Sequence, residues 1–93
     1  LGPGFNVERA ARIKKETGLV TRTVGFIAGP KHADDVVTHG GVDQVALARA
    51  FLDDPNWGWH AAEALGHPFT IPPQYQRVKA GSWPGASETR AFT

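Results

Sequence analysis

The sequence predicts an α/β fold with a small parallel sheet, and it predicts that this sheet is incomplete. Stretches with a helical spacing of apolar residues alternate with runs of β-branched residues along the 93-residue chain. One helix-like stretch separates two strand-like runs, which indicates a β-α-β unit with a right-handed crossover. Two parallel strands leave two edges open and much apolar surface without a partner. We therefore expect the last part of a larger α/β protein rather than a complete independent fold.

The first helix is expected over residues 7–17. Asn6 stands where an N-cap is expected, and Gly18 is the residue type that most often follows the last turn of a helix. The apolar positions of this stretch share one face at helical spacing; they are Val7, Ala10, Ala11 and Ile13. Basic and acidic residues cover the other sides.

The first strand is expected over residues 19–28. This run is rich in β-branched residues without strict alternation, which is typical of a strand buried on both faces of a parallel sheet. Gly29 and Pro30 end the strand, and Pro30 suits the first turn of a second helix. That helix is expected to end at Gly40 and Gly41.

The second strand is expected over residues 42–48, and a helical turn over 49–52 follows it directly. After an interruption at residues 53–55, a further helix over residues 56–65 is expected to end at Gly66. The remainder is rich in Pro and Gly, so it is expected to be extended or irregular. The chain thus divides into terminal βα units over residues 1–66 and an extended C-terminal arm over residues 67–93.

Composition excludes several kinds of protein. The chain has no cysteine, which removes disulfide scaffolds, iron–sulfur sites and thiol nucleophiles. A net charge of +1 with dispersed Lys and Arg does not suggest a nucleic-acid partner. No apolar run is long enough for a membrane span and no signal peptide is recognisable, so we expect a cytoplasmic protein. Methionine is also absent and the chain starts at Leu1, so we expect a segment of a longer gene product.

The ends of the two expected strands are the best candidates for a binding site, because ligands of parallel α/β folds bind beyond these carboxyl ends. Gly25 would allow close approach of a ligand, and Ala48 and Arg49 lie where the second strand turns into a helix. Free amides at that turn and the Arg49 guanidinium suit a phosphate. Two alternatives stay open: Gly25 marks only a bulge, and Arg49 forms only a surface ion pair. A short extra helix beside a phosphate site after the last two strands is also a recurrent feature of (β/α)8 barrels.

Other polar and aromatic groups give weaker signals. We interpret the histidines as solvated or capping side chains, with no metal site expected; they are His32, His39, His60 and His67. The aspartate pairs at residues 34–35 and 53–54 are interpreted as solvated surface rather than as carboxylate pairs for acid–base chemistry. Trp57 is expected to hold the last helix against the barrel wall. Residues 69–77 combine aromatic side chains with Arg77, and form either an interface arm or a tail packed on its own domain.

Several segments are distinctive when they are taken together. The most specific is VALARAFLDDP at residues 45–55, and the others are residues 5–14, 23–27, 41–44 and the final PQYQR at 73–77. Together they resemble the closing part of the Old Yellow Enzyme-like NAD(P)H:flavin oxidoreductases. The last segment is similar to the end of the shorter bacterial branch that includes xenobiotic reductases. The resemblance covers about residues 3–77, and residues 78–93 have no counterpart in it.

This resemblance implies a fold, an activity and a cofactor site. The two strands would be strands 7 and 8 of an FMN-dependent (β/α)8 TIM barrel, an ene-reductase that takes hydride from NADPH or NADH and reduces activated C=C bonds. The backbone of Gly25, Phe26 and Ala48, together with the Arg49 guanidinium, would bind the FMN phosphate. The family commonly has glycine at the position of Ala48.

The resemblance also implies partners. Tyr75 and Arg77 match a C-terminal segment that reaches into the active site of a neighbouring subunit, which implies a homo-oligomer joined through the arm and an enone as substrate. The family's substrate-gripping, proton-donating and flavin-tuning residues lie upstream. We therefore expect no catalytic residue in this chain, and expect the N-terminal part of the barrel as its partner. Two other interpretations stay open: a segment of another FMN barrel of the dienoyl-CoA reductase kind, and a non-catalytic fragment that binds phosphate or a partner.

Overall fold

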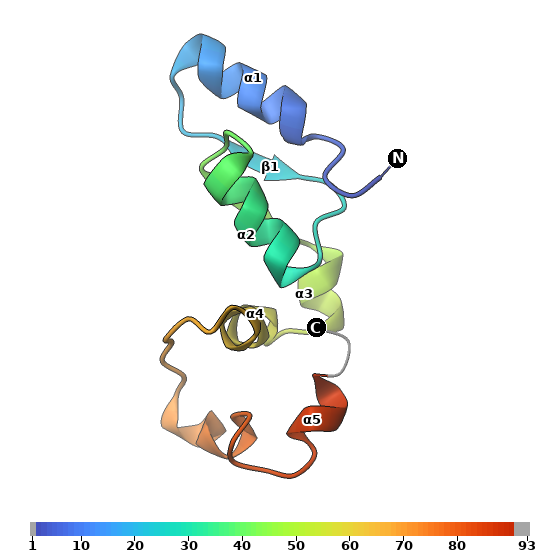
Figure 1. The fold of residues 1–93 in the computed structure, drawn as a ribbon, viewed down its shortest axis with the longest axis vertical. Coiled ribbons are helices and arrows are strands. Elements are labelled where there is room, and N and C mark those ends of the chain that lie inside the picture. Colours follow the sequence, from blue (N-terminus) through green and yellow to red (C-terminus); the bar gives the residue numbers. More distant parts are fainter. Residues whose placement is uncertain (1, 91–93) are drawn as a thin grey trace.

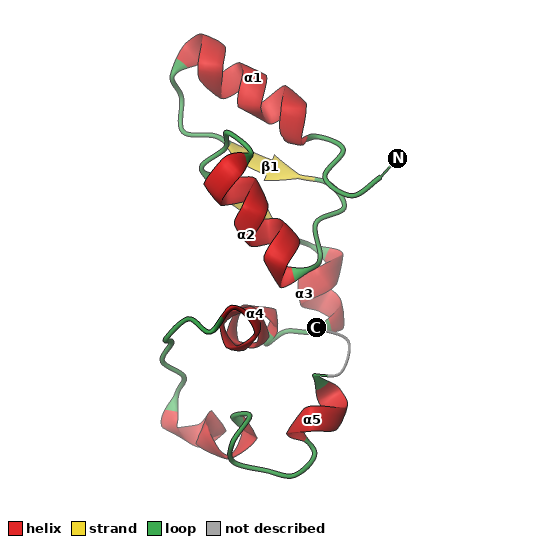
Figure 2. Cartoon of the chain, viewed as in Figure 1, coloured by secondary structure: helices red, strands yellow, loops and turns green. Residues whose placement is uncertain are grey.

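The computed structural model describes residues 2–90, which form an elongated molecule of 48 × 26 × 20 Å. Its radius of gyration, 15.2 Å, exceeds the roughly 12 Å expected for a compact domain of this length. The elements are α1 (Val7–Thr17), β1 (Arg22–Val24), α2 (Pro30–His39), β2 (Gln44–Ala46), α3 (Arg49–Asp53), α4 (Trp57–Leu65), the 3₁₀ helix η1 (Pro73–Val78) and α5 (Ala86–Thr89). Figure 1 shows α1, β1 and α2 together, with α4 and the C-terminal segment toward the other end of the long axis. Figure 2 shows how little of the chain is strand.

Helix α1 occupies the residues expected from the sequence. Gly18 follows it in the left-handed conformation, with φ 74°, and donates its N–H to the Lys14 carbonyl at 2.8 Å. The expected cap at the other end is wrong in one respect. Asn6 stands at the N-cap position, but its side chain makes no capping bond; its Nδ2 donates instead to the Val24 carbonyl at 2.9 Å. Asn6 therefore ties the start of α1 to the end of β1.

The β-α-β unit is confirmed, and β1 and β2 pair in parallel with Thr23 opposite Val45. Each strand is three residues long, so the predicted strands 19–28 and 42–48 were too long. Two local features shorten β1. The Thr21 N–H is taken by a carboxylate of Asp43 rather than by a neighbouring strand, and the positive φ angles of Gly25 and Phe26 are incompatible with a continuing strand.

One face of the sheet is covered by helices and the other is open. The core lies between α1, α2 and β2; it consists of Ala10, Val36 and Val42, with Val7, Ala11 and Val45 packed against it. Thr23 faces the same side as Val45 and is buried, whereas the next residue, Val24, is 53% exposed. The expectation that the first strand is buried on both faces is therefore wrong for this structure.

The C-terminal half follows the sequence up to Gly66 and then departs from it. Helices α3 and α4 lie where they were expected, and Gly66 ends α4 in the left-handed conformation, with φ 67°. Residues 67–93, expected to be extended or irregular, include η1 and α5; residues 91–93 lie outside the described part of the chain. Proline is tolerated in the first turn of a helix, so Pro73 does not prevent η1. The Gln76 side chain adds a hydrogen bond to the Ile71 carbonyl at 3.2 Å.

Asp43 joins α1 to both strands. One carboxylate oxygen accepts from Lys14 Nζ at 2.6 Å, and the other accepts from the Thr21 N–H at 2.9 Å. The hydrogen bond from Lys14 is the main cause of a lowered Asp43 pKa, and the Thr21 N–H lowers it further below the ordinary 3.8. A carboxyl with a lowered folded-state pKa stabilises the fold above its unfolded pKa. That stabilisation is lost as the pH falls below 3.8 toward the folded-state pKa.

We therefore expect acid to destabilise the protein partly through Asp43. Urea unfolding at pH values from about 6 down to about 2.5 should give a free energy of unfolding that falls in the acid range. The Asp43→Asn protein should show a shallower fall. Asp34→Asn, an exposed carboxyl on α2, is the matched control and should keep the parent's slope. An Asp43→Asn protein with the parent's acid dependence would contradict the assignment.

Candidate functional site

A cavity lies at the carboxyl ends of the two strands. Because β1 and β2 run parallel, the residues that follow Val24 and Ala46 come to the same edge of the sheet. This cavity has a volume of about 690 Å³, and its lining includes the four residues singled out from the sequence: Gly25, Phe26, Ala48 and Arg49. The structure thus brings the four together, and their binding role stays a prediction.

Helix α3 gives the cavity its polar side. Ala48 is the N-cap of α3, and its carbonyl accepts from the Leu52 N–H at 3.0 Å. The amides of the first turn of a helix have no acceptor within that helix, so they are available to an anion. Ala48 has φ −98°, an angle open to any residue. An alanine is therefore accommodated where the resembling family commonly has glycine.

The side chain of Arg49 is exposed at this cavity. Within residues 2–90 its guanidinium makes no hydrogen bond or ion pair with the protein. The alternative that Arg49 serves a surface ion pair is therefore not seen in the described part of the chain. Arg22, at the opposite end of the strands, is different: its Nε donates to the Gln44 side chain at 3.0 Å.

The structure explains why residue 25 is a glycine, and the sequence alone did not reveal this reason. Its φ is 128°, and the following Phe26 also has a positive φ of 48°. A Cβ on Gly25 would lie 2.9 Å from Phe5 Cζ and 2.9 Å from Asn6 Nδ2. The close approach expected of a ligand is thus made by the chain's own N-terminal loop, and approach of a ligand stays a prediction.

Phe5 is a cavity residue that the sequence analysis missed, since it lines the same cavity as Gly25 and Arg49. The sequence did contain a signal for this role, because Phe5 is an aromatic residue that follows a Gly- and Pro-rich loop and comes just before a helix. Tyr75 and Arg77 do not line this cavity. They lie on η1, toward the other end of the molecule (Figure 1).

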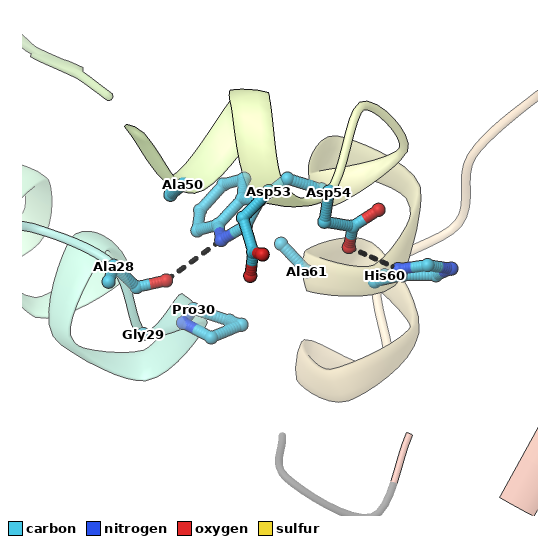
Figure 3. Close-up of a pocket in the computed structure, with 9 residues that line it drawn as sticks. Ala28, Gly29, Pro30, Ala50, Asp53, Asp54, His60 and Ala61 are labelled. Atoms are coloured by element: carbon cyan, nitrogen blue, oxygen red, sulfur yellow. Dashed lines mark hydrogen bonds and ion pairs between the residues drawn. The ribbon is translucent and has the colours of Figure 1, made fainter. Parts of the chain in front are cut away.

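A second cavity, of about 260 Å³, lies between the start of α2, α3 and α4 (Figure 3). Trp57 Nε1 donates to the Ala28 carbonyl at 2.8 Å, so Trp57 fastens α4 to the loop after β1. The Asp54 carboxylate accepts from the Asn56 N–H at 3.0 Å and contacts His60 Nδ1 at 2.5 Å. Asp54 is therefore a bonded side chain in the α3–α4 turn, so the prediction of a solvated surface carboxylate is wrong for Asp54. Asp53 is exposed, as that prediction requires.

Residues 2–90 contain neither a candidate metal-binding cluster nor a membrane-spanning helix. No three His, Asp or Glu side chains there are grouped closely enough to hold a metal ion. In the same residues no helix has both the length and the apolar character needed to cross a membrane.

The comparisons with known proteins point to one group. No family model matches the chain. It is 39% identical over 75 residues to a protein named NADPH dehydrogenase from Geobacillus thermodenitrificans, and 31% identical over 75 residues to an NADPH dehydrogenase from Bacillus subtilis. Each match covers 81% of this chain and 22% of the relative, so the chain spans about a fifth of the length of these relatives. The resemblance to the Old Yellow Enzyme-like NADPH dehydrogenases that the sequence predicts is thereby confirmed over four fifths of this chain.

Proposed function

We propose that this chain is the phosphate-binding C-terminal part of an FMN-dependent NAD(P)H oxidoreductase, an ene-reductase that reduces activated C=C bonds. The names of the relatives support an oxidoreductase that uses NADPH. In this proposal β1 and β2 are strands 7 and 8 of a (β/α)8 barrel in the cytoplasm. The rest of the barrel is the chain's partner.

The observation that carries the proposal is the common cavity of Gly25, Phe26, Ala48 and Arg49. The donors at this cavity suit a phosphate dianion. The first turn of α3 presents backbone amides. Arg49 presents a planar guanidinium that makes no hydrogen bond or ion pair with another described side chain. These residues would hold the phosphate end of FMN.

FMN held by these residues would supply the hydride-transfer chemistry between NAD(P)H and an activated alkene. The contribution of this chain is to bind and orient the cofactor. Its amides and Arg49 would fix the phosphate, while the apolar residues Phe5 and Phe26 line the same cavity. By the resemblance, the groups that grip the substrate and donate the proton lie outside this chain.

The large exposed surface of the chain supports the proposal that it is part of a barrel. The solvent-accessible area is 6768 Å², against about 5200 Å² for a compact monomer of this mass. Apolar side chains on the sheet side opposite the helices and at the cavity are more than half exposed, Val24 at 53% and Phe26 at 57%. Further strands along the edges of β1 and β2 would complete the sheet, and the barrel interior would cover these side chains.

The C-terminal segment has its own place in the proposal. Tyr75 and Arg77 are exposed on η1 and lie away from the cavity of their own chain. We assign them to the active site of a neighbouring subunit in a homo-oligomer. There Arg77 would supply a cation to the substrate.

A visible absorption spectrum of the full protein, this chain together with the rest of the proposed barrel, tests the proposal. We expect a flavin band that bleaches on anaerobic addition of NADPH and returns when a cyclic enone is added. A protein that stays colourless after incubation with FMN and gel filtration would overturn the proposal and favour a non-catalytic fragment. Return of the band with a dienoyl-CoA thioester, but with no simple enone, would favour the dienoyl-CoA reductase-like alternative.

A further inference from the structure

Arg90 joins two elements that are distant in the sequence. Its Nε donates to Glu63 Oε2 at 2.9 Å and its Nη2 donates to Glu63 Oε1 at 3.2 Å, so the guanidinium grips the carboxylate of α4 with two bonds. The same Nη2 also donates to the Val78 carbonyl, the last residue of η1, at 3.0 Å. One side chain thus connects the end of η1 to α4.

The opposite part of η1 is held on the same helix. The ring of Tyr75 packs edge-on against Trp59 of α4, with ring centroids 5.2 Å apart. Trp59 and Glu63 are four residues apart and therefore share one face of α4. Two side-chain links thus connect η1 to that face of α4: Tyr75 contacts Trp59, and Arg90 joins the Val78 carbonyl to Glu63.

The Glu63–Arg90 pair differs from a surface ion pair. Both side chains are only 16% exposed, whereas Arg12 and Glu16 on α1 form a pair whose side chains are 78% and 61% exposed. The bond from Arg90 is the main cause of a lowered Glu63 pKa. A second donor, Trp83 Nε1, reaches the Val78 carbonyl at 3.3 Å. Both donors come from residues 79–90, which the resemblance does not cover.

We propose that residues 79–90 act as a clamp on η1, and that Arg90 and Glu63 are positioning residues for Tyr75 and Arg77. The effect of this clamp on activity rests on the proposed function of Arg77 at a neighbouring active site. The mechanical part of the proposal, that the clamp holds η1 in one position, does not depend on that function. A short 3₁₀ helix has poor hydrogen-bond geometry and little stability of its own, so external bonds decide whether it keeps one position.

Hydrogen–deuterium exchange of the isolated holoprotein tests the mechanical part. In the Arg90→Ala protein the amides of η1, including the Tyr75 N–H that bonds the Pro72 carbonyl, should exchange about tenfold faster. Glu63→Gln should give the same change in a smaller degree. The matched control is Arg12→Ala, which removes the exposed ion pair of α1 and should leave η1 exchange unchanged. Unchanged η1 exchange in both Arg90→Ala and Glu63→Gln would overturn the proposal.

Steady-state kinetics of the full holoenzyme, this chain with the rest of the proposed barrel, with a cyclic enone test the positioning role. Arg90→Ala should raise KM about fivefold or more with little loss of kcat, and Arg90→Lys should recover part of the loss. If Arg90 acts through Arg77, the KM of the Arg77→Ala, Arg90→Ala double variant should equal that of Arg77→Ala alone. Effects that multiply would overturn the positioning role. Faster η1 exchange combined with a normal KM in Arg77→Ala would instead show that the proposed function of Arg77 is wrong.

Discussion

Replacing Arg49 by alanine is expected to weaken FMN binding about ten- to a hundred-fold, since hydrogen bonds to charged groups contribute about 1.5–3 kcal/mol. Arg49 lines the cavity and its guanidinium has no hydrogen-bond or ion-pair partner within the described residues, so its removal breaks no internal polar contact. The folded chain should therefore keep its stability while it loses cofactor. Titration of the apoprotein with FMN, followed by flavin fluorescence, measures the change directly.

The matched control is Arg22→Ala. Arg22 lies on the same strand pair as the cavity but at the opposite end, and its partner is Gln44. It should bind FMN as the parent does. Arg49→Lys keeps the charge without the planar fork and should fall between the parent and Arg49→Ala. Equal FMN affinity in the parent and Arg49→Ala would remove Arg49 from the phosphate site.

Replacing Gly25 by alanine is expected to lower the free energy of unfolding by about 2–4 kcal/mol and to impair FMN retention as well. The backbone at φ 128° is unfavourable for any residue with a Cβ. The new Cβ would also displace Phe5 and Asn6, and Asn6 would lose its bond to the Val24 carbonyl. Urea unfolding gives the stability change, and the flavin content of the purified protein gives the effect on the site.

Gly18→Ala separates the two causes of this effect. Gly18 also has a positive φ, 74°, but nothing lies within 4 Å of the position of its Cβ. Its substitution should cost about 1 kcal/mol from backbone strain alone and should leave FMN content unchanged. If Gly25→Ala lowered the free energy of unfolding no more than Gly18→Ala, the contact with Phe5 and Asn6 would not contribute to the effect of the substitution.

The elements marked by local signals could be predicted from the sequence. Gly18 and Gly66 end α1 and α4 because a left-handed residue after the last turn is cheap only for glycine. Pro30 starts α2 for an equally local reason. Gly25, Ala48 and Arg49 were found at the cavity because the parallel direction of two strands fixes which of their ends meet, whereas Phe26 was implied only by the resemblance.

The remaining features depend on contacts between distant residues. Asn6 has the right residue type for a cap, but its side chain bonds Val24 eighteen residues away. Composition alone suggested an extended tail after residue 66. It could not reveal that Arg90 pairs with Glu63, because the separation of 27 residues leaves no periodic signal. Phe5 was missed at the cavity for the same reason.

The ion pair between Lys14 and Asp43 has a consequence beyond stability. Asp43 also exchanges backbone and side-chain bonds with Thr21, just before the paired residues Arg22 and Gln44. A slip of the strands by one residue would move the proposed phosphate donors after β1 by about 3.3 Å relative to those after β2. Hydrogen bonds from both sets to one phosphate could not be kept after a shift of that size. The contacts of Asp43 where the two strands begin therefore fix the strand register on which the proposed phosphate site at their carboxyl ends depends.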